Sequence, residues 1–155
     1  MNEYPSNILV KVLYDEFPEI ARKVEQKVKE IIPERTLSDF SYVSDIVKLY
    51  CHANNLEIKI LINIDKKRSL SNHRRILAVT LIKMFQPEVL LCLINKSISS
   101  KLILNYKNEL GLSAKTARQD MKIAKQHYHF YKDFRQCVNN SFNLILEQYG
   151  SKEVK

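Results

Sequence analysis

Hydrophobic residues recur along most of this 155-residue chain at intervals of three and four, the spacing of an amphipathic helix. Pro18 opens one such segment and Pro33 ends it, with an apolar stripe formed by Ile20, Val24, Val28, Ile31 and Ile32. The pattern from Thr36 to Asp39 predicts a capping box for the next helix. The inner face of that helix would comprise Phe40, Val43, Val47, Tyr50 and Cys51.

Residues 56–64 depart from this helical rhythm. Apolar and polar residues alternate there, and the β-branched side chains at every second position predict a short strand. A strand needs a partner, and the other candidate, residues 7–14, is equally compatible with a helix. We therefore expect an N-terminal helical or small α+β module over residues 1–65.

From residue 66 to the C-terminus the pattern predicts a helical domain. Amphipathic helices are expected over 73–86, 97–110 and 113–128, with a short apolar helix over 87–94. A phase break near Lys132 indicates a bend and a final helix with its own stripe of Phe134, Val138, Phe142, Ile145 and Tyr149. This stripe either closes the core or pairs with a second copy of the chain. The predicted fold class is mainly α, a helical bundle that contains a helix-turn-helix in its C-terminal half and a small strand element near 56–64.

The segment LGLSAKTARQDMKIAK, residues 110–125, separates apolar from charged positions. Gly111 can end one helix in the left-handed conformation, and Ser113 can cap the next. At 100° per residue, one narrow packing face contains Ala117, Met121, Ala124 and Tyr128. A second face, about 110° away, carries Lys115, Arg118, Lys122 and Lys125.

A helix that enters the DNA major groove needs this separation, because one side must pack on a scaffold while the other presents hydrogen-bond donors. Arg118 and Gln119 are the candidates for reading bases, since a guanidinium can donate twice to guanine and an amide can pair with adenine. Phosphate contacts are assigned to Lys115, Thr116, Lys122 and Lys125, with Ser113 at the helix start.

LGLSAKTARQDM resembles the turn and recognition helix of DeoR-type winged helix-turn-helix repressors. The positions that match that pattern are Leu110, Gly111, Leu112, Ser113, Thr116, Arg118, Asp120 and Met121. The resemblance implies a DNA-binding module, although the family's wing hairpin has no counterpart after Tyr128.

Charge favours an anionic partner. Twenty-five Lys and Arg against 17 Asp and Glu give a net charge of +8. The densest basic cluster, between residues 65 and 75, consists of Lys66, Lys67, Arg68, His73, Arg74 and Arg75. It is either a charged loop or a second phosphate-contacting surface, to which we assign Lys66, Lys67, Arg68, Arg74 and Arg75.

The chain offers no signature of an enzyme or of a cofactor site. Its two glycines exclude phosphate-cradling loops, and its three separated cysteines favour a reducing cytoplasm over disulfides or structural zinc. No apolar run approaches the roughly 20 residues of a membrane span. We therefore expect a cytoplasmic transcriptional regulator that binds double-stranded DNA, with the C-terminal helix as the contact if it forms a homodimer. The alternatives are a helical adaptor or assembly protein that binds acidic protein surfaces, or a replication or packaging accessory of a mobile element.

Overall fold

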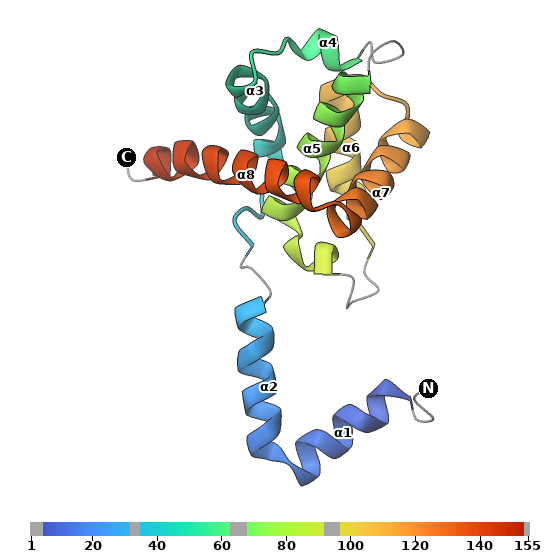
Figure 1. The fold of residues 1–155 in the computed structure, drawn as a ribbon, viewed down its shortest axis with the longest axis vertical. Coiled ribbons are helices and arrows are strands. Elements are labelled where there is room, and N and C mark those ends of the chain that lie inside the picture. Colours follow the sequence, from blue (N-terminus) through green and yellow to red (C-terminus); the bar gives the residue numbers. More distant parts are fainter. Residues whose placement is uncertain (1–4, 32–34, 63–67, 92–96, 154–155) are drawn as a thin grey trace. The chain divides into compact units, whose positions relative to one another are not determined.

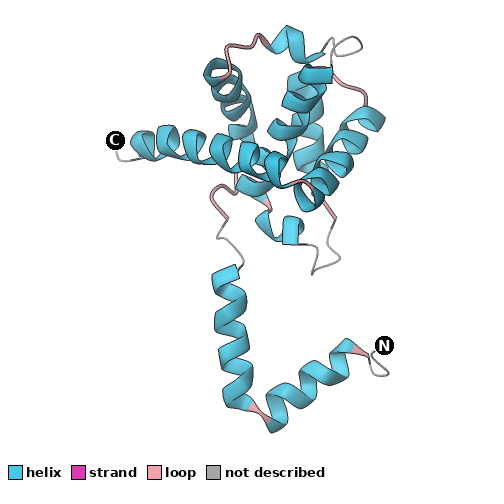
Figure 2. Cartoon of the chain, in the orientation of Figure 1, coloured by secondary structure: helices cyan, strands magenta, loops and turns pink. Residues whose placement is uncertain are grey.

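The computed structural model describes residues 5–31, 35–62, 68–91 and 97–153, and the chain divides at residue 33 into two compact units. Helices form almost all of the described regions, which contain no strand (Figures 1 and 2). The first unit contains α1 (Ser6–Glu16) and α2 (Pro18–Ile31). The second unit contains α3 (Val43–Ala53), α4 (Ile58–Ile62), α5 (Arg68–Phe85), α6 (Ser100–Leu110), α7 (Ala114–Phe130) and α8 (Lys132–Glu153), with the short 3-10 helices η1 (Phe40–Tyr42) and η3 (Pro87–Leu91). The mainly α fold class is confirmed.

The first unit is a helical hairpin with a single connecting residue. Phe17 ends α1 by donating its backbone N–H to the Leu13 carbonyl, and Pro18 occupies the first position of α2, where a missing N–H costs nothing. Ala21 is the one described residue of this unit that is buried. A hydrogen bond from the Tyr14 hydroxyl to the Glu25 carboxylate links the two helices.

The second unit is built around α5. From Ile76 to Ile82 every residue of α5 is buried, and a helix that is covered on all sides lies at the centre of a domain. Helices α3, α4, α6, α7 and α8 all pack against it. Buried polar groups are satisfied locally: the Thr80 hydroxyl donates to the Ile76 carbonyl at 2.8 Å, and the Gln86 side chain accepts from the Ser99 backbone at 2.7 Å.

The predicted strand at 56–64 is wrong, because Ile58–Ile62 form the short helix α4. The described part of the chain contains no second strand, whereas a helix satisfies its own backbone hydrogen bonds. Helix packing also suits the sequence, since Leu61 is fully buried and Ile58 packs against the same core three residues earlier. Residues 63 and 64 of the predicted strand lie outside the described residues.

The boundary between the units falls at residue 33 and not at residue 65 as predicted. Residues of α3 such as Val43, Ile46 and Val47 belong to the same hydrophobic core as α5 and α7. Thr36 is not the helix cap either, since η1 begins only at Phe40; its backbone N–H donates to the Met84 carbonyl. Asp39 caps η1 instead, by accepting from the Ser41 backbone N–H at 2.9 Å.

Helix α8 uses its apolar stripe inside the second unit. Phe134, Val138, Ile145 and Tyr149 are buried in the core cluster, and Phe142 packs against it. The bend predicted near Lys132 is present, because α7 ends at Phe130 and α8 begins at Lys132. Of the two roles expected for this stripe, the structure shows closure of the core.

Candidate nucleic-acid interface

The turn between α6 and α7 forms as its sequence predicts. Gly111 adopts a left-handed conformation (φ 61°, ψ 33°), which a residue with a Cβ atom would adopt only at a cost. The Leu112 backbone N–H donates to the Lys107 carbonyl at 3.0 Å, so the turn satisfies a carbonyl at the end of α6. The side chain of Leu112 packs against the core.

Ser113 caps α7 together with Thr116. The Ser113 hydroxyl accepts from the Thr116 backbone N–H at 3.1 Å and donates to the Thr116 hydroxyl at 2.8 Å. Both candidate phosphate ligands at the start of α7 therefore have a structural role. The cap fixes the position at which α7 begins, and with it the position of the cations that follow.

Helix α7 has one buried and one exposed face. Ala117, Met121 and Ala124 are fully buried, as the helical spacing predicts. Six polar or basic side chains point away from this packing face: Lys115, Arg118, Gln119, Lys122, Lys125 and Gln126. Lys125 is half-buried, and the other five are exposed. Within the described residues, none of these four cations has a carboxylate at ion-pairing distance. The face defined by Lys115, Arg118, Gln119, Lys122 and Lys125 is called the basic face of α7 below.

A buried ion pair fixes α7 to α5. The Arg74 Nη2 atom donates to Asp120 Oδ1 at 3.0 Å. Arg74 Nε lies 2.6 Å from Asp120 Oδ2 without the geometry of a hydrogen bond, so this second contact is electrostatic. The two side chains are only 12% and 9% exposed.

Tyr106 of α6 joins this ion pair to a third helix. Its hydroxyl lies 3.3 Å from both Asp120 Oδ2 and the Arg74 carbonyl, and it can donate to either. Burial, and then the Asp120 charge, raise the pKa of Tyr106 well above its usual range, so the hydroxyl keeps its proton. Helices α5, α6 and α7 are thus held by one polar network behind the basic face.

The network corrects one predicted DNA contact. Arg74 cannot offer its guanidinium to a phosphate, because that group is committed to Asp120 inside the protein. Asp120 is the one acidic residue of α7 and lies next to the apolar stripe, which is a signal in the sequence, but spacing alone does not show which cation would contact it. Neither Asp120 nor Tyr106 was identified from the sequence as part of a polar network.

The rest of the basic cluster is only partly visible. Lys66 and Lys67 lie outside the described residues. Arg68 is the first residue of α5, and its side chain lies outside the described part. Arg75 is half-buried and lines an open groove with Asn72, His127, Tyr131, Asp133, Phe134 and Cys137. Burial, and then the Arg75 charge, lower the pKa of His127.

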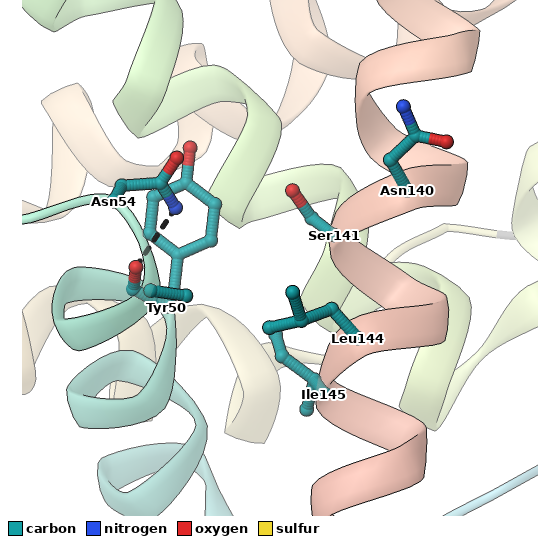
Figure 3. A pocket seen from close by; sticks show the side chains of 7 residues that line it. Tyr50, Asn54, Asn140, Ser141, Leu144 and Ile145 are labelled. Atoms are coloured by element: carbon teal, nitrogen blue, oxygen red, sulfur yellow. Dashed lines mark hydrogen bonds between the residues drawn. The ribbon is translucent and has the colours of Figure 1, made fainter.

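A small cavity lies between α3 and α8 (Figure 3). Tyr50 and Asn54 line it from α3 and the following turn, and Asn140, Ser141 and Leu144 line it from α8. Its volume of about 170 Å³ is smaller than the roughly 300–1,000 Å³ of typical ligand pockets. The described residues also contain no cluster of His, Cys, Asp and Glu that could hold a metal ion.

Comparisons with protein-family models, with curated proteins and with solved structures found no match for this chain. Among the described helices, none is both long and apolar enough to cross a membrane. The site must therefore be interpreted from its own geometry.

Proposed function

We propose that the protein binds double-stranded DNA through the basic face of α7 and acts as a transcriptional regulator. The observation that carries the proposal is a row of four cations on the side of α7 that faces away from the core, none of which has an acidic partner among the described residues. The other side of this helix is fixed by packing and by the Arg74–Asp120 pair. A recognition helix needs both properties, because donors read a groove only if their helix keeps its orientation.

The positions on α7 divide into two roles. Arg118 and Gln119 are adjacent, exposed and close to the helix start, where recognition helices contact base edges. Lys115, Lys122 and Lys125 supply charge for phosphates, which gives affinity rather than sequence preference. The positive end of the α7 dipole, capped by Ser113, adds to the attraction for a phosphate.

The charge distribution supports an anionic partner for the second unit. Residues 34–155 contain 20 Lys and Arg and 11 Asp and Glu, a net charge of +9, whereas residues 1–33 contain five and six. The whole excess of positive charge thus belongs to the unit that carries α7. Such an excess attracts a polyanion over distances comparable with the Debye length.

An acidic protein surface is the alternative partner, and one observation favours it. The C-terminal end of α7 exposes two aromatic rings beside the basic face, with Phe130 72% and Tyr131 57% exposed. A shallow hollow there is lined by Lys122, Lys125, Gln126, His129 and Phe130. Aromatic side chains are enriched in protein interfaces relative to the rest of the surface, and lysines beside them would attract an acidic partner.

Fluorescence anisotropy with a mixed-sequence duplex at several salt concentrations tests the proposal. The wild type should lose affinity steeply with salt. The double variant Arg118→Ala with Lys122→Ala should bind more weakly, with a slope of log K against log salt smaller by about 1, because one phosphate contact contributes about 0.9 and only Lys122 of the two is assigned to a phosphate. A change of about 2 would show that Arg118 contacts a phosphate as well.

The matched control is Lys48→Ala with Lys59→Ala, which removes two exposed lysines from α3 and α4. It lowers the net charge by the same amount and should leave most of the affinity and slope intact. Equal losses in the two double variants would show that binding follows net charge and not the basic face. Absence of binding by the wild type at low salt would overturn the proposal and favour an acidic protein partner.

A further inference from the structure

Taken by itself, the helical hairpin of residues 1–33 has a large apolar surface that its own two helices do not cover. Nine large apolar side chains in it are 44–53% exposed: Ile8, Leu9, Val10, Val12, Tyr14, Phe17, Ile20, Val24 and Val28. Scattered exposed apolar residues are normal on proteins, but these occupy most apolar positions of two packed helices.

The hairpin cannot form a core from its own residues. Its apolar positions on α1 spread over about 240° of the helix circumference at 100° per residue, and α2 can cover only one side of them. On α2, Ile20, Val24 and Val28 form one stripe, with Ala21 at its edge as the buried residue. Units of fewer than about 40 residues usually need a metal, disulfides or oligomerisation to be stable. Residues 1–33 contain no cysteine.

We propose that this hairpin pairs with the hairpin of a second copy of the chain, so that two α1–α2 pairs form a four-helix bundle. The pairing buries the stripe of α2 and the uncovered sides of α1 against the same surfaces of the partner. Equivalent surfaces meet in a two-fold dimer, which requires a patch that complements itself.

The charge of the hairpin favours a second copy over other occupants. Its five basic and six acidic residues are interspersed along the chain and give a net charge of −1, so the hairpin can face itself without strong repulsion. A helix that lies on a membrane surface is usually rich in Lys and Arg with few acids, and a nucleic-acid surface also needs an excess of positive charge. The hairpin has neither composition.

The area available is sufficient for a dimer. Half of an aromatic side chain is on the order of 100 Å² and half of an aliphatic one is less, so the nine residues offer roughly 800 Å² per chain. If the partner covers about three quarters of this surface, the interface buries about 1,200 Å² in total, which is the lower limit for specific, stable protein interfaces. The α2 stripe lies at the centre of this surface and should contribute most to affinity.

The test is the mass of the full chain in solution, measured by light scattering and by sedimentation over a wide range of concentrations. The wild type should give about 36 kDa, twice the 18.2 kDa of one chain. The variant Ile20→Gln with Val24→Gln, which removes half-exposed apolar groups without adding charge, should give the mass of a monomer. Glutamine keeps a high helix propensity, so the helix itself should be preserved.

The control variant is Arg22→Gln with Lys29→Gln, which changes two exposed residues on the opposite side of the same helix. It should remain a dimer. A wild type that stays monomeric at high micromolar concentration overturns the proposal, as does a dimer that survives the stripe substitutions or is lost equally in the control. A monomeric wild type that sediments with vesicles of uncharged lipid, and loses this binding in the stripe variant, would identify a membrane surface as the occupant of the hairpin instead. None of these measurements involves DNA, so their outcome is independent of the proposed DNA binding.

Discussion

Replacing Asp120 by asparagine is the perturbation for which the structure gives the clearest magnitude. The carboxylate and the Arg74 guanidinium are about nine-tenths buried, and they contact each other through two pairs of atoms. Removing the negative charge leaves the guanidinium inside the protein without a counter-charge. Breaking a buried ion pair from one side costs about 3–5 kcal/mol, and we expect the lower end because both side chains keep some solvent contact.

A loss of about 3 kcal/mol is a large fraction of the 5–15 kcal/mol that stabilises an ordinary domain. Urea unfolding followed by far-UV circular dichroism would measure it as a lower midpoint with an unchanged m value. The control Glu57→Gln alters an exposed carboxylate in the same unit and should shift the free energy of unfolding by less than about 0.5 kcal/mol.

A double-mutant cycle separates the ion pair from general disturbance of the core. Arg74→Met in the Asp120→Asn background should restore at least about 1 kcal/mol relative to the sum of the single losses, because no unpaired charge then remains buried. A loss below about 1 kcal/mol for Asp120→Asn, or strictly additive losses in the cycle, would refute the conclusion that this pair fixes α7.

Two further predictions concern the turn before α7 and a partly buried histidine. Gly111→Ala should lower the free energy of unfolding by about 1–2 kcal/mol, because alanine adopts the positive φ of this position only at a cost. Ser113→Ala should lower it by about 1 kcal/mol, because the Thr116 backbone N–H loses its acceptor. Urea unfolding measures both losses, and negligible values would contradict the turn geometry. The Nδ1 atom of His73 lies 2.9 Å from the Tyr50 hydroxyl, and burial lowers the pKa of this histidine. As the pH falls, His73 therefore takes up a proton in the unfolded chain before it does so in the folded one. The free energy of unfolding should thus decrease as the pH drops below about 6.5. His73→Gln should make this fall shallower between about pH 7 and 5, and an unchanged pH profile would assign the effect to other groups.

Helical spacing in the sequence was enough to predict which face of α7 is buried. In α7, Ala117, Met121 and Ala124 are buried and Arg118 and Lys122 are exposed, because a period of 3.6 residues leaves little freedom once the helix is recognised. The glycine turn and the serine cap were equally predictable, since each depends on residues within four positions of one another.

Alternation failed as a signal at residues 56–62 for a related reason. Ile58 and Ile60 fit a period of two, but Leu61 lies three residues after Ile58 and also fits a helix. In a segment this short the local pattern cannot decide between the two, and packing decides instead. As part of a helix, Leu61 is fully buried in the core, and the described part of the chain contains no strand with which this segment could pair.

The assignment of Arg74 to a DNA phosphate was wrong for a different reason. The guanidinium binds Asp120, which lies 46 residues further along the sequence. Spacing shows on which side of its own helix a cation lies, but not what the neighbouring helix places opposite. Asp120 lies at the edge of the α7 stripe that faces α5, and this proximity makes Arg74 a structural residue. A count of basic residues therefore overestimates the charge available to a ligand.

The same distinction bears on how the proposed interface could work. The energy of the Arg74–Asp120 pair is used to hold α7 in place, while the exposed cations of α7 remain free of carboxylates within the described residues. Free cations on an unfixed helix would attract phosphates but could not favour one base over another, since direct readout depends on side chains held at defined positions. If the proposal holds, Asp120→Asn at a temperature where the chain stays folded should reduce sequence preference more than total affinity, whereas loss of Lys122 should do the reverse. The two substitutions thus distinguish two contributions of α7 to DNA binding: the fixed orientation of its side chains and their electrostatic attraction for phosphates.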